Sequence, residues 1–378
     1  MIDRPVRLTR RAALVGTLAL SACGAAATVP AAGAGPRLVA DPGWAAWVEG
    51  FRARAAAQGV ASSTLAAAFA GAGYVPEAIE RDRAQAEFRR SLEDYLALVA
   101  GEDRVAEGRA AFARQRGTLA AVEARFRVPA PIVAAIWGVE SRYGARRGTF
   151  PVVSSLSTLA YDGRRGRFFE GQLLAAMRIL QAGDVGADRM VGSWAGAMGH
   201  TQFIPTSYLA YAVDFTGDGR RDIWGEDPTD ALASTAAYLA RSGWRAGEPW
   251  GGEAGTSAAA GGRTLRPDAN GPAFGVRRNF DVIKRYNNSD LYALAVGILA
   301  GRIAGGGPLR AGFGPDRHGL TLQDRQALQR GLSAAGFDAG PPDGVLGART
   351  REAVAAYQTS QGLPATGEPS RALLDRLR

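Results

Sequence analysis

One glutamate is the strongest candidate for chemistry in this sequence. Glu140 lies near the end of a predicted helix that starts at Pro131 and stops at Gly144, because proline fits a first helical turn and glycine fits a helix end. One apolar stripe of this helix consists of Ile132, Ala135, Ile136 and Val139. Beside that stripe, the helix dipole and partial desolvation both disfavour the ionised form of Glu140. We therefore expect the pKa of Glu140 to be raised and the residue to act as a general acid. The alternative is a surface glutamate paired with Arg142 or with another of the many arginines.

A segment rich in small residues, from residue 192 to 208, predicts a ligand groove. Its small residues lie between Trp194, Met198 and Phe203, and they allow the backbone to approach a ligand closely, as a sugar groove requires. Ser193 and Gln202 can supply a hydroxyl and an amide for hydrogen bonds to a sugar. Tight packing between helices is the alternative explanation of the same small residues.

A third cluster has the spacing of a calcium-binding loop. Positions 1, 3, 5 and 6 of an EF-hand loop are occupied here by Asp214, Thr216, Asp218 and Gly219. Arg220 offers a backbone carbonyl at the next ligand position, but Gly225 stands where that loop has its bidentate glutamate. The alternative is a connector built from Asx turns. We expect any calcium to be structural, and the chemistry to require no cofactor.

Four segments together resemble the membrane-bound lytic transglycosylase B family of murein-degrading lipoproteins. They follow one another in the order of that family, from about Trp44 to Gly305, and cover residues 136–144, 192–208, 212–219 and 284–289. The resemblance implies a mainly α, lysozyme-like fold and an enzyme that cleaves the β-1,4 bond between MurNAc and GlcNAc, leaving 1,6-anhydroMurNAc ends. Its substrate is the glycan strand of peptidoglycan.

The same resemblance implies roles for individual residues. It makes Glu140 the single catalytic acid and base, and Ser193 the residue that orients the reacting muramyl sugar. It closes the possible calcium-binding loop that begins at Asp214, the acidic loop, with a later aspartate, for which Asp230 is our choice. The rest of the glycan groove is implied to consist of Gln202, Tyr238, Tyr286, Asn287 and Tyr292.

This chemistry needs only one carboxylate. A glycosidase that delivers water or forms a covalent adduct usually has two acids flanking the bond. No second acid adjoins Glu140 in the sequence, and Asp162 is the only later candidate nearby. In a lytic transglycosylase the sugar's own 6-hydroxyl attacks, and intramolecular attack benefits from a high effective concentration. Two alternatives remain: a muramidase that hydrolyses the same bond, and a non-catalytic scaffold that binds peptidoglycan.

Helical periodicity predicts the elements that position these residues. Apolar side chains recur at helical spacing in the segments 44–51, 65–69, 88–98, 104–126, 132–140, 168–180, 231–240 and 291–303. Before residue 250 we find no alternating pattern typical of strands. Residues 251–280 are rich in glycine, alanine and proline and predict an irregular excursion or a short hairpin. We therefore expect a helical catalytic domain over residues 41–304, followed by a linker over residues 305–318.

The last residues, 319–378, predict a small three-helix module. Amphipathic patterns indicate helices over residues 324–335, 349–361 and 370–377. Tight turns at Asp343-Gly344 and Gly347, followed by Tyr357-Gln358 and Gly362, resemble the common peptidoglycan-binding domain. We expect this module to hold the enzyme on the wall and to raise its local concentration there.

The first residues predict export. Arginines precede the apolar run Ala12–Leu20, which is too short to span a bilayer, and Leu20-Ser21-Ala22-Cys23 resembles a lipobox. We expect residues 1–23 to be an export signal, Cys23 to be acylated, and residues 24–40 to be a tether. Arg10-Arg11 is consistent with twin-arginine export. The alternative is cleavage after a later small residue, which removes Cys23. The expected location is the periplasm, with a lipid anchor in the outer membrane.

Composition excludes several classes of site. The 378 residues include one cysteine and two histidines, so an intramolecular disulfide or a zinc cluster is not expected. The formal net charge of +9 comes from arginine, with Lys284 as the only lysine. Without a basic block interleaved with aromatic residues, we expect no nucleic-acid partner. A cationic surface suits an anionic polymer such as peptidoglycan, while any partner among cell-wall synthesis or division proteins is left unidentified.

Overall fold

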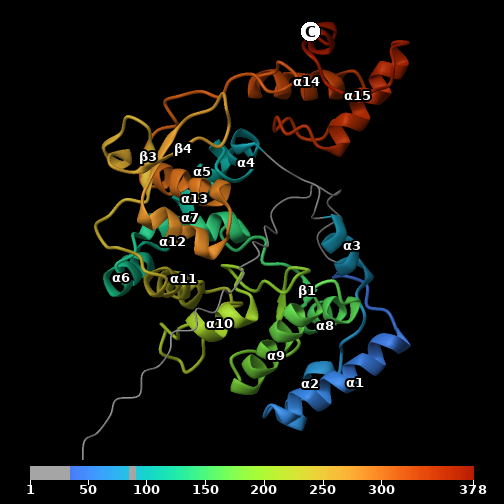
Figure 1. Cartoon of the computed structure of the whole chain (residues 1–378), viewed down its shortest axis with the longest axis vertical. Helices are drawn as coiled ribbons and strands as arrows, with labels where there is room; N and C mark the ends of the chain where they lie inside the picture. Colours follow the sequence, from blue (N-terminus) through green and yellow to red (C-terminus); the bar gives the residue numbers. More distant parts are fainter. Residues whose placement is uncertain (1–34, 85–90) are drawn as a thin grey trace, which may run out of the picture.

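The computed structural model describes residues 35–84 and 91–378, and Figure 1 shows their arrangement. The prediction of a mainly α protein is confirmed. One group of helices surrounds the pair α8 and α9, and consists of α1 (Pro42–Ala57), α2 (Ser62–Phe69), α3 (Pro76–Ala84), α8 (Val152–Asp162), α9 (Gly166–Ala182) and α10 (Pro205–Tyr211). Cys23 and the other residues of the expected export signal lie outside the described residues.

A second group of helices is built around α7 and α13. Its members are α4 (Leu92–Val99), α5 (Glu102–Arg114), α6 (Arg116–Phe126), α7 (Ala130–Ser141), α11 (Thr229–Arg241), α12 (Arg278–Tyr286) and α13 (Asp290–Ile303). Both α7 and α13 are apolar on almost every side and are buried. The two groups share one continuous hydrophobic core, so the helix that carries Glu140 is fixed by packing over most of its surface.

Short strands complete the catalytic part. β1 (Phe150–Pro151) pairs antiparallel with β2 (Val191–Gly192). Downstream, β3 (Gly251–Glu253), β4 (Arg263–Leu265) and β5 (Phe274–Val276) form a sheet in the order β3-β5-β4, with the 3-10 turn Ser257–Ala259 packed on it. A Cβ on Gly275 would lie 2.2 Å from the Ala259 carbonyl oxygen, so this turn requires glycine there. The irregular excursion or hairpin expected at 251–280 is thus a three-stranded sheet.

Several boundaries differ from the sequence predictions. The single helix expected over 104–126 is wrong, since the chain leaves helical geometry at Gln115. Both resulting helices pack on α7, but α5 also packs on α13 and α6 on α11. The helices α3, α8, α10 and α12 were not predicted. Within the expected tether, Val39 forms an antiparallel bridge with Tyr74. Among the residues that the structure describes, no helix is both long and apolar enough to cross a membrane.

The C-terminal module has its own core. It consists of α14 (Leu322–Ala334), α15 (Ala348–Ser360) and α16 (Arg371–Arg376), packed around a cluster that includes Leu328, Leu332, Val354 and Leu374. In Figure 1 this red module lies beside α4. Arg325, whose side chain is only 3% exposed, connects the two parts through ion pairs with Glu93, Asp94 and Asp316. The expected linker is also attached, because Glu253 accepts hydrogen bonds from the backbone of Arg310 and Ala311.

Candidate active site

Glu140 lies in the last turn of α7, as the sequence predicted. The residues before it, from 132 to 139, are buried, whereas Glu140 itself keeps partial exposure. Its Oε1 accepts a hydrogen bond of 2.7 Å from the hydroxyl of Tyr292, which is buried on α13. The two residues are 152 positions apart, so only the packing of α7 against α13 brings them together.

Burial raises the pKa of Glu140 to about 7, while the hydrogen bond from Tyr292 acts in the opposite direction. The carboxyl group can therefore both donate and accept a proton near neutral pH. Arg142 does not neutralise it, because the Arg142 guanidinium pairs with Glu107 on α5 and lowers the pKa of that carboxyl. No arginine among the described residues forms an ion pair with Glu140, so the alternative of a surface glutamate paired with Arg142 or another arginine is wrong.

No other carboxylate among the described residues perturbs the pKa of Glu140. A second acid flanking the same bond would raise that pKa by repulsion between like charges. Asp162, the later candidate from the sequence, pairs instead with Arg83 at 3.0 Å. In the described part of the chain, no ion pair, hydrogen bond or pKa effect links Glu140 to a second carboxylate.

Three tyrosines form a row that begins at Glu140, the tyrosine row, which consists of Tyr292, Tyr286 and Tyr238. The rings of Tyr286 and Tyr292 are parallel within 8°, and Tyr286 in turn contacts Tyr238 with ring centroids 4.9 Å apart. Their hydroxyls bond within the protein, that of Tyr286 to the Thr201 carbonyl at 2.7 Å and that of Tyr238 to the Arg285 carbonyl. Burial raises the pKa of Tyr238 to about 12 and raises those of Tyr286 and Tyr292 well above the usual value for tyrosine, so all three stay protonated donors.

Ser193 and Gln202 lie in a compact double turn between β2 and α10. Met198 forms backbone bridges with both Gly192 and Phe203, and the Ser193 hydroxyl accepts the Ala197 N–H at 3.0 Å. Gln202 has a positive φ of 54° and donates its amide to the carbonyls of Arg147 and Gly199. Both amide N–H donors are thereby used inside the protein, so any ligand would meet its Oε1.

Asn287 and the segment after Glu140 complete the surroundings. Asn287 is buried at the end of α12, next in the chain to Tyr286. Residues 144–149, which follow α7, line a surface hollow. Two residues of this region, Arg147 and His200, were not predicted as site residues. Arg147 donates hydrogen bonds to the backbone carbonyls of Trp224 and Gly225, and the His200 ring accepts one from the indole of Trp137. A lone histidine in a glycine-rich segment gives no sequence signal for such a contact.

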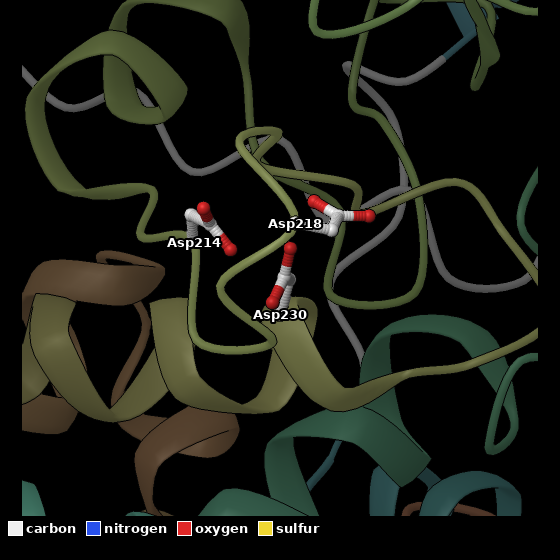
Figure 2. A group of neighbouring side chains, drawn as sticks. All are labelled: Asp214, Asp218 and Asp230. Atoms are coloured by element: carbon white, nitrogen blue, oxygen red, sulfur yellow. The ribbon is translucent and has the colours of Figure 1, made fainter.

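The acidic loop brings three predicted ligands together. Carboxylate oxygens of Asp214, Asp218 and Asp230 lie within 4.8 Å of one another, and Figure 2 shows them converging from the loop and from the start of α11. Asp214 also accepts the Thr216 hydroxyl at 3.2 Å, and Arg220 donates its backbone N–H to Asp218. An all-oxygen set of this kind fits a hard cation such as Ca²⁺. The set also fits the Asx-turn alternative, because each aspartate already accepts backbone N–H groups.

A family model described as "Transglycosylase SLT domain" matches residues 43–261 and 253–301. The chain belongs to this family. A second model, for a peptidoglycan binding domain, matches residues 321–377, which contain all three helices of the C-terminal module. Glu140, the tyrosine row and the acidic loop all lie inside the SLT transglycosylase domain.

Relatives with known names agree with this membership. The chain is 36% identical over 211 residues to membrane-bound lytic murein transglycosylase B of Escherichia coli strain K12, an alignment that spans 47% of this chain and 57% of that relative's length. SltB3 of Pseudomonas aeruginosa, solved with NAG-NAM-pentapeptide, is 46% identical with a TM-score of 0.69, covering 89% of this chain and 100% of that one. Slt35 of E. coli, solved with calcium, is 26% identical with a TM-score of 0.60, covering 71% and 95%.

Proposed function

We propose that this protein is a lytic transglycosylase that cleaves the MurNAc-GlcNAc β-1,4 bond of peptidoglycan and leaves 1,6-anhydroMurNAc ends. Glu140 acts first as the general acid and then as the general base. Membership of the SLT transglycosylase family supports the reaction class. The burial of Glu140, with a pKa of about 7 on which no second carboxylate acts, supports the one-carboxylate mechanism and is the observation that carries the proposal.

In the first step, protonated Glu140 donates its proton to the glycosidic oxygen. The bond between that oxygen and C1 of the muramyl sugar breaks, and the GlcNAc side leaves with a hydroxyl. Positive charge develops at C1, where the carbonyl oxygen of the muramyl N-acetyl group stabilises it. The Tyr292 hydroxyl donates a hydrogen bond to the carboxylate that forms on Glu140, and a bond to an ionised acceptor is a strong one.

In the second step, the Glu140 carboxylate takes the proton from the 6-hydroxyl of the same muramyl sugar. The oxygen O6 attacks C1, the anhydro ring closes, and Glu140 returns to its protonated form. No water is consumed, so atoms and protons balance over the two steps. The donor and the acceptor are the same carboxyl group, and a pKa near the working pH serves both roles.

The test is digestion of purified sacculi followed by mass spectrometry of the products. Transglycosylation gives ends lighter by one water than hydrolysis does, and no ¹⁸O enters from labelled water. Glu140→Gln is expected to lower the rate by at least about a hundredfold, which is typical for loss of a general acid and base. Glu170→Gln is the matched control, because Glu170 pairs with Arg54 on the surface of α9, away from the tyrosine row.

Each other result selects one alternative. Hydrolysed ends carrying ¹⁸O would identify a muramidase. Binding to sacculi without any cleavage would identify a scaffold. Equal rates for wild type and Glu140→Gln would remove Glu140 from the mechanism even if anhydro ends were formed.

We also propose that the loop from Asp214 to Asp230 binds a structural Ca²⁺. The converging carboxylates of Asp214, Asp218 and Asp230 support this, together with the Thr216 hydroxyl and the backbone carbonyl of Arg220. The ion would neutralise acidic groups that lie within 4.8 Å of one another and would take no part in proton transfer.

Finally, we propose export to the periplasm with a lipid on Cys23, and binding of the wall by the C-terminal module. The lipobox-like sequence supports the anchor, and the name of the E. coli relative, which is membrane-bound, agrees with it. The match to a peptidoglycan binding domain supports the role of the module. Labelling cells with a fatty acid tests the anchor, since Cys23→Ala should abolish incorporation.

A further inference from the structure

The chain makes a left-handed turn directly after Glu140. Arg142, Tyr143 and Gly144 have φ values of 52°, 56° and 88°, a region that residues with a Cβ rarely adopt, least of all in succession. Surrounding contacts hold the turn in place. The Arg142 guanidinium is bound by Glu107, and the Tyr143 ring meets the Trp137 ring edge-on at 5.6 Å. Such a conformation persists only where the structure around it enforces it.

His200 joins this turn from the opposite side. Its backbone carbonyl accepts the Ser141 hydroxyl at 2.5 Å, and its Nδ1 lies 3.1 Å from the indole Nε1 of Trp137. The Nε2 atom lies 2.7 Å from the Gly225 carbonyl oxygen and 3.3 Å from Nη1 of Arg147, which donates to the same carbonyl at 2.7 Å. A Cβ on Gly144 would lie 2.6 Å from the imidazole, so the glycine makes room for the ring.

These partners determine the tautomer of the imidazole. An indole N–H only donates, so Nδ1 must accept, and a carbonyl only accepts, so Nε2 must carry the proton. The ring is therefore neutral. Desolvation is the largest effect on the pKa of His200 and lowers it, the hydrogen bond to Gly225 acts against it, and the neighbouring Arg147 lowers the pKa further. Burial and the hydrogen bonds agree on the same protonation state.

We propose that His200 is a positioning residue for Glu140. Its two contacts on α7, with Trp137 and Ser141, lie on either side of Glu140 in the sequence. Its third contact fixes the ring to Gly225, which lies within the loop from Asp214 to Asp230. Tyr292 holds the carboxylate itself, and His200 holds the helical turn from which that carboxylate projects. The role of Glu140 as acid and base rests on the proposed function, but its placement by His200 does not.

Two substitutions separate the two ring contacts. His200→Gln retains an N–H near the position of Nε2 and loses the acceptor for Trp137. His200→Asn retains an acceptor near the position of Nδ1 and loses the donor to Gly225. His318→Gln changes the other histidine of the chain, which lies in the linker, and is the matched control.

The first measurement is turnover on sacculi. We expect His200→Gln to lower kcat by about tenfold or more with KM within about twofold, because small misplacements of a catalytic group cost rate rather than binding. His200→Asn should recover most of that loss, and His318→Gln should match wild type. Trp137→Phe deletes the same hydrogen bond from the other side, and it should lower kcat without adding to the effect of His200→Gln.

The second measurement needs no substrate. The Glu140 carboxyl can be followed by ¹³C NMR, with Glu140→Gln identifying its signal, and its pKa read in each variant. We expect His200→Gln to lower the pKa of Glu140 toward that of a solvated glutamate, and Trp137→Phe to do the same if His200→Gln does not fold. An unchanged Glu140 pKa and unchanged kcat in both variants would overturn the proposal. So would equal losses of kcat in His200→Gln and His200→Asn that follow only the melting temperatures of the two variants.

If wild type formed no anhydro ends, the proposed function would fail, and the NMR titration would still decide the role of His200.

Discussion

Replacing Glu140 by glutamine should stabilise the protein at alkaline pH. Burial raises the pKa of Glu140 from 4.5 to about 7, so the folded chain holds this proton more tightly than the unfolded chain does. The carboxyl group costs no stability below pH 4.5, an increasing amount as the pH rises toward 7, and its full amount above 7. Glutamine has the same shape and never ionises, so the variant does not incur this cost.

The magnitude follows from the two pKa values. The interval between 4.5 and about 7 corresponds to about 3 kcal/mol, and the part between pH 5.5 and 7 corresponds to about 2 kcal/mol. Glu140 keeps partial exposure, and solvent screening reduces both figures. We therefore expect the free energy of unfolding of Glu140→Gln, relative to wild type, to rise by about 1–2 kcal/mol between pH 5.5 and 8.5.

Urea titration at the two pH values measures this difference. Comparing the variant with wild type at each pH cancels the contribution of every other titrating group, and Glu170→Gln supplies a control whose relative stability should not change with pH. If the relative stability of Glu140→Gln were the same at both pH values, or fell at pH 8.5, the carboxyl group would not be desolvated in the folded protein. The acid role would then lose its physical basis.

Three further predictions concern the residues around the site. Tyr292→Phe removes the hydrogen bond that lowers the pKa of Glu140, so the alkaline limb of the pH-rate profile should move to higher pH and kcat should fall; a limb that stays in place would separate Tyr292 from the titrating group. Calcium at about a hundred times its Kd should stabilise wild type by about 2.7 kcal/mol in thermal unfolding, and Asp218→Asn should weaken this response. Arg325→Ala leaves Glu93 and Asp94 without their buried partner, so limited proteolysis should cut the linker faster while cleavage of soluble glycan fragments stays the same.

Much of the helical fold could be predicted from apolar spacing, both for helices that bury one face, such as α1 and α9, and for the buried helices α7, α11 and α13. α8 escaped prediction because its buried residues include the polar Ser154, Ser155, Ser157 and Thr158, so its buried side carries no continuous apolar stripe. The break at Gln115 has no proline beside it to mark it in the sequence; α5 and α6 both pack on α7, but α5 also packs on α13 and α6 on α11.

The candidate site shows the same limit. Glu140 could be found because it follows an apolar stripe in a short segment. Its environment could not be derived from spacing, because Tyr292 and His200 approach it from α13 and from the turn after β2. The tyrosines were assigned to the groove by resemblance alone. Their hydrogen bonds to backbone carbonyls, which fix the rings, are visible only once α11, α12 and α13 are packed.

Desolvation and hydrogen bonding at Glu140 oppose each other, and the proposed reaction needs both. Burial alone would produce a carboxyl group that gives up its proton reluctantly, and a fully solvated carboxylate would rarely hold a proton at neutral pH. The Tyr292 hydroxyl counteracts part of the desolvation, and the pKa of Glu140 settles at about 7. A single acid that must first give a proton and then take one is best served by this intermediate value. The loss of stability expected above pH 7 therefore has the same physical origin as the acid and base activity of Glu140. A substitution that abolishes this loss of stability should also abolish that activity.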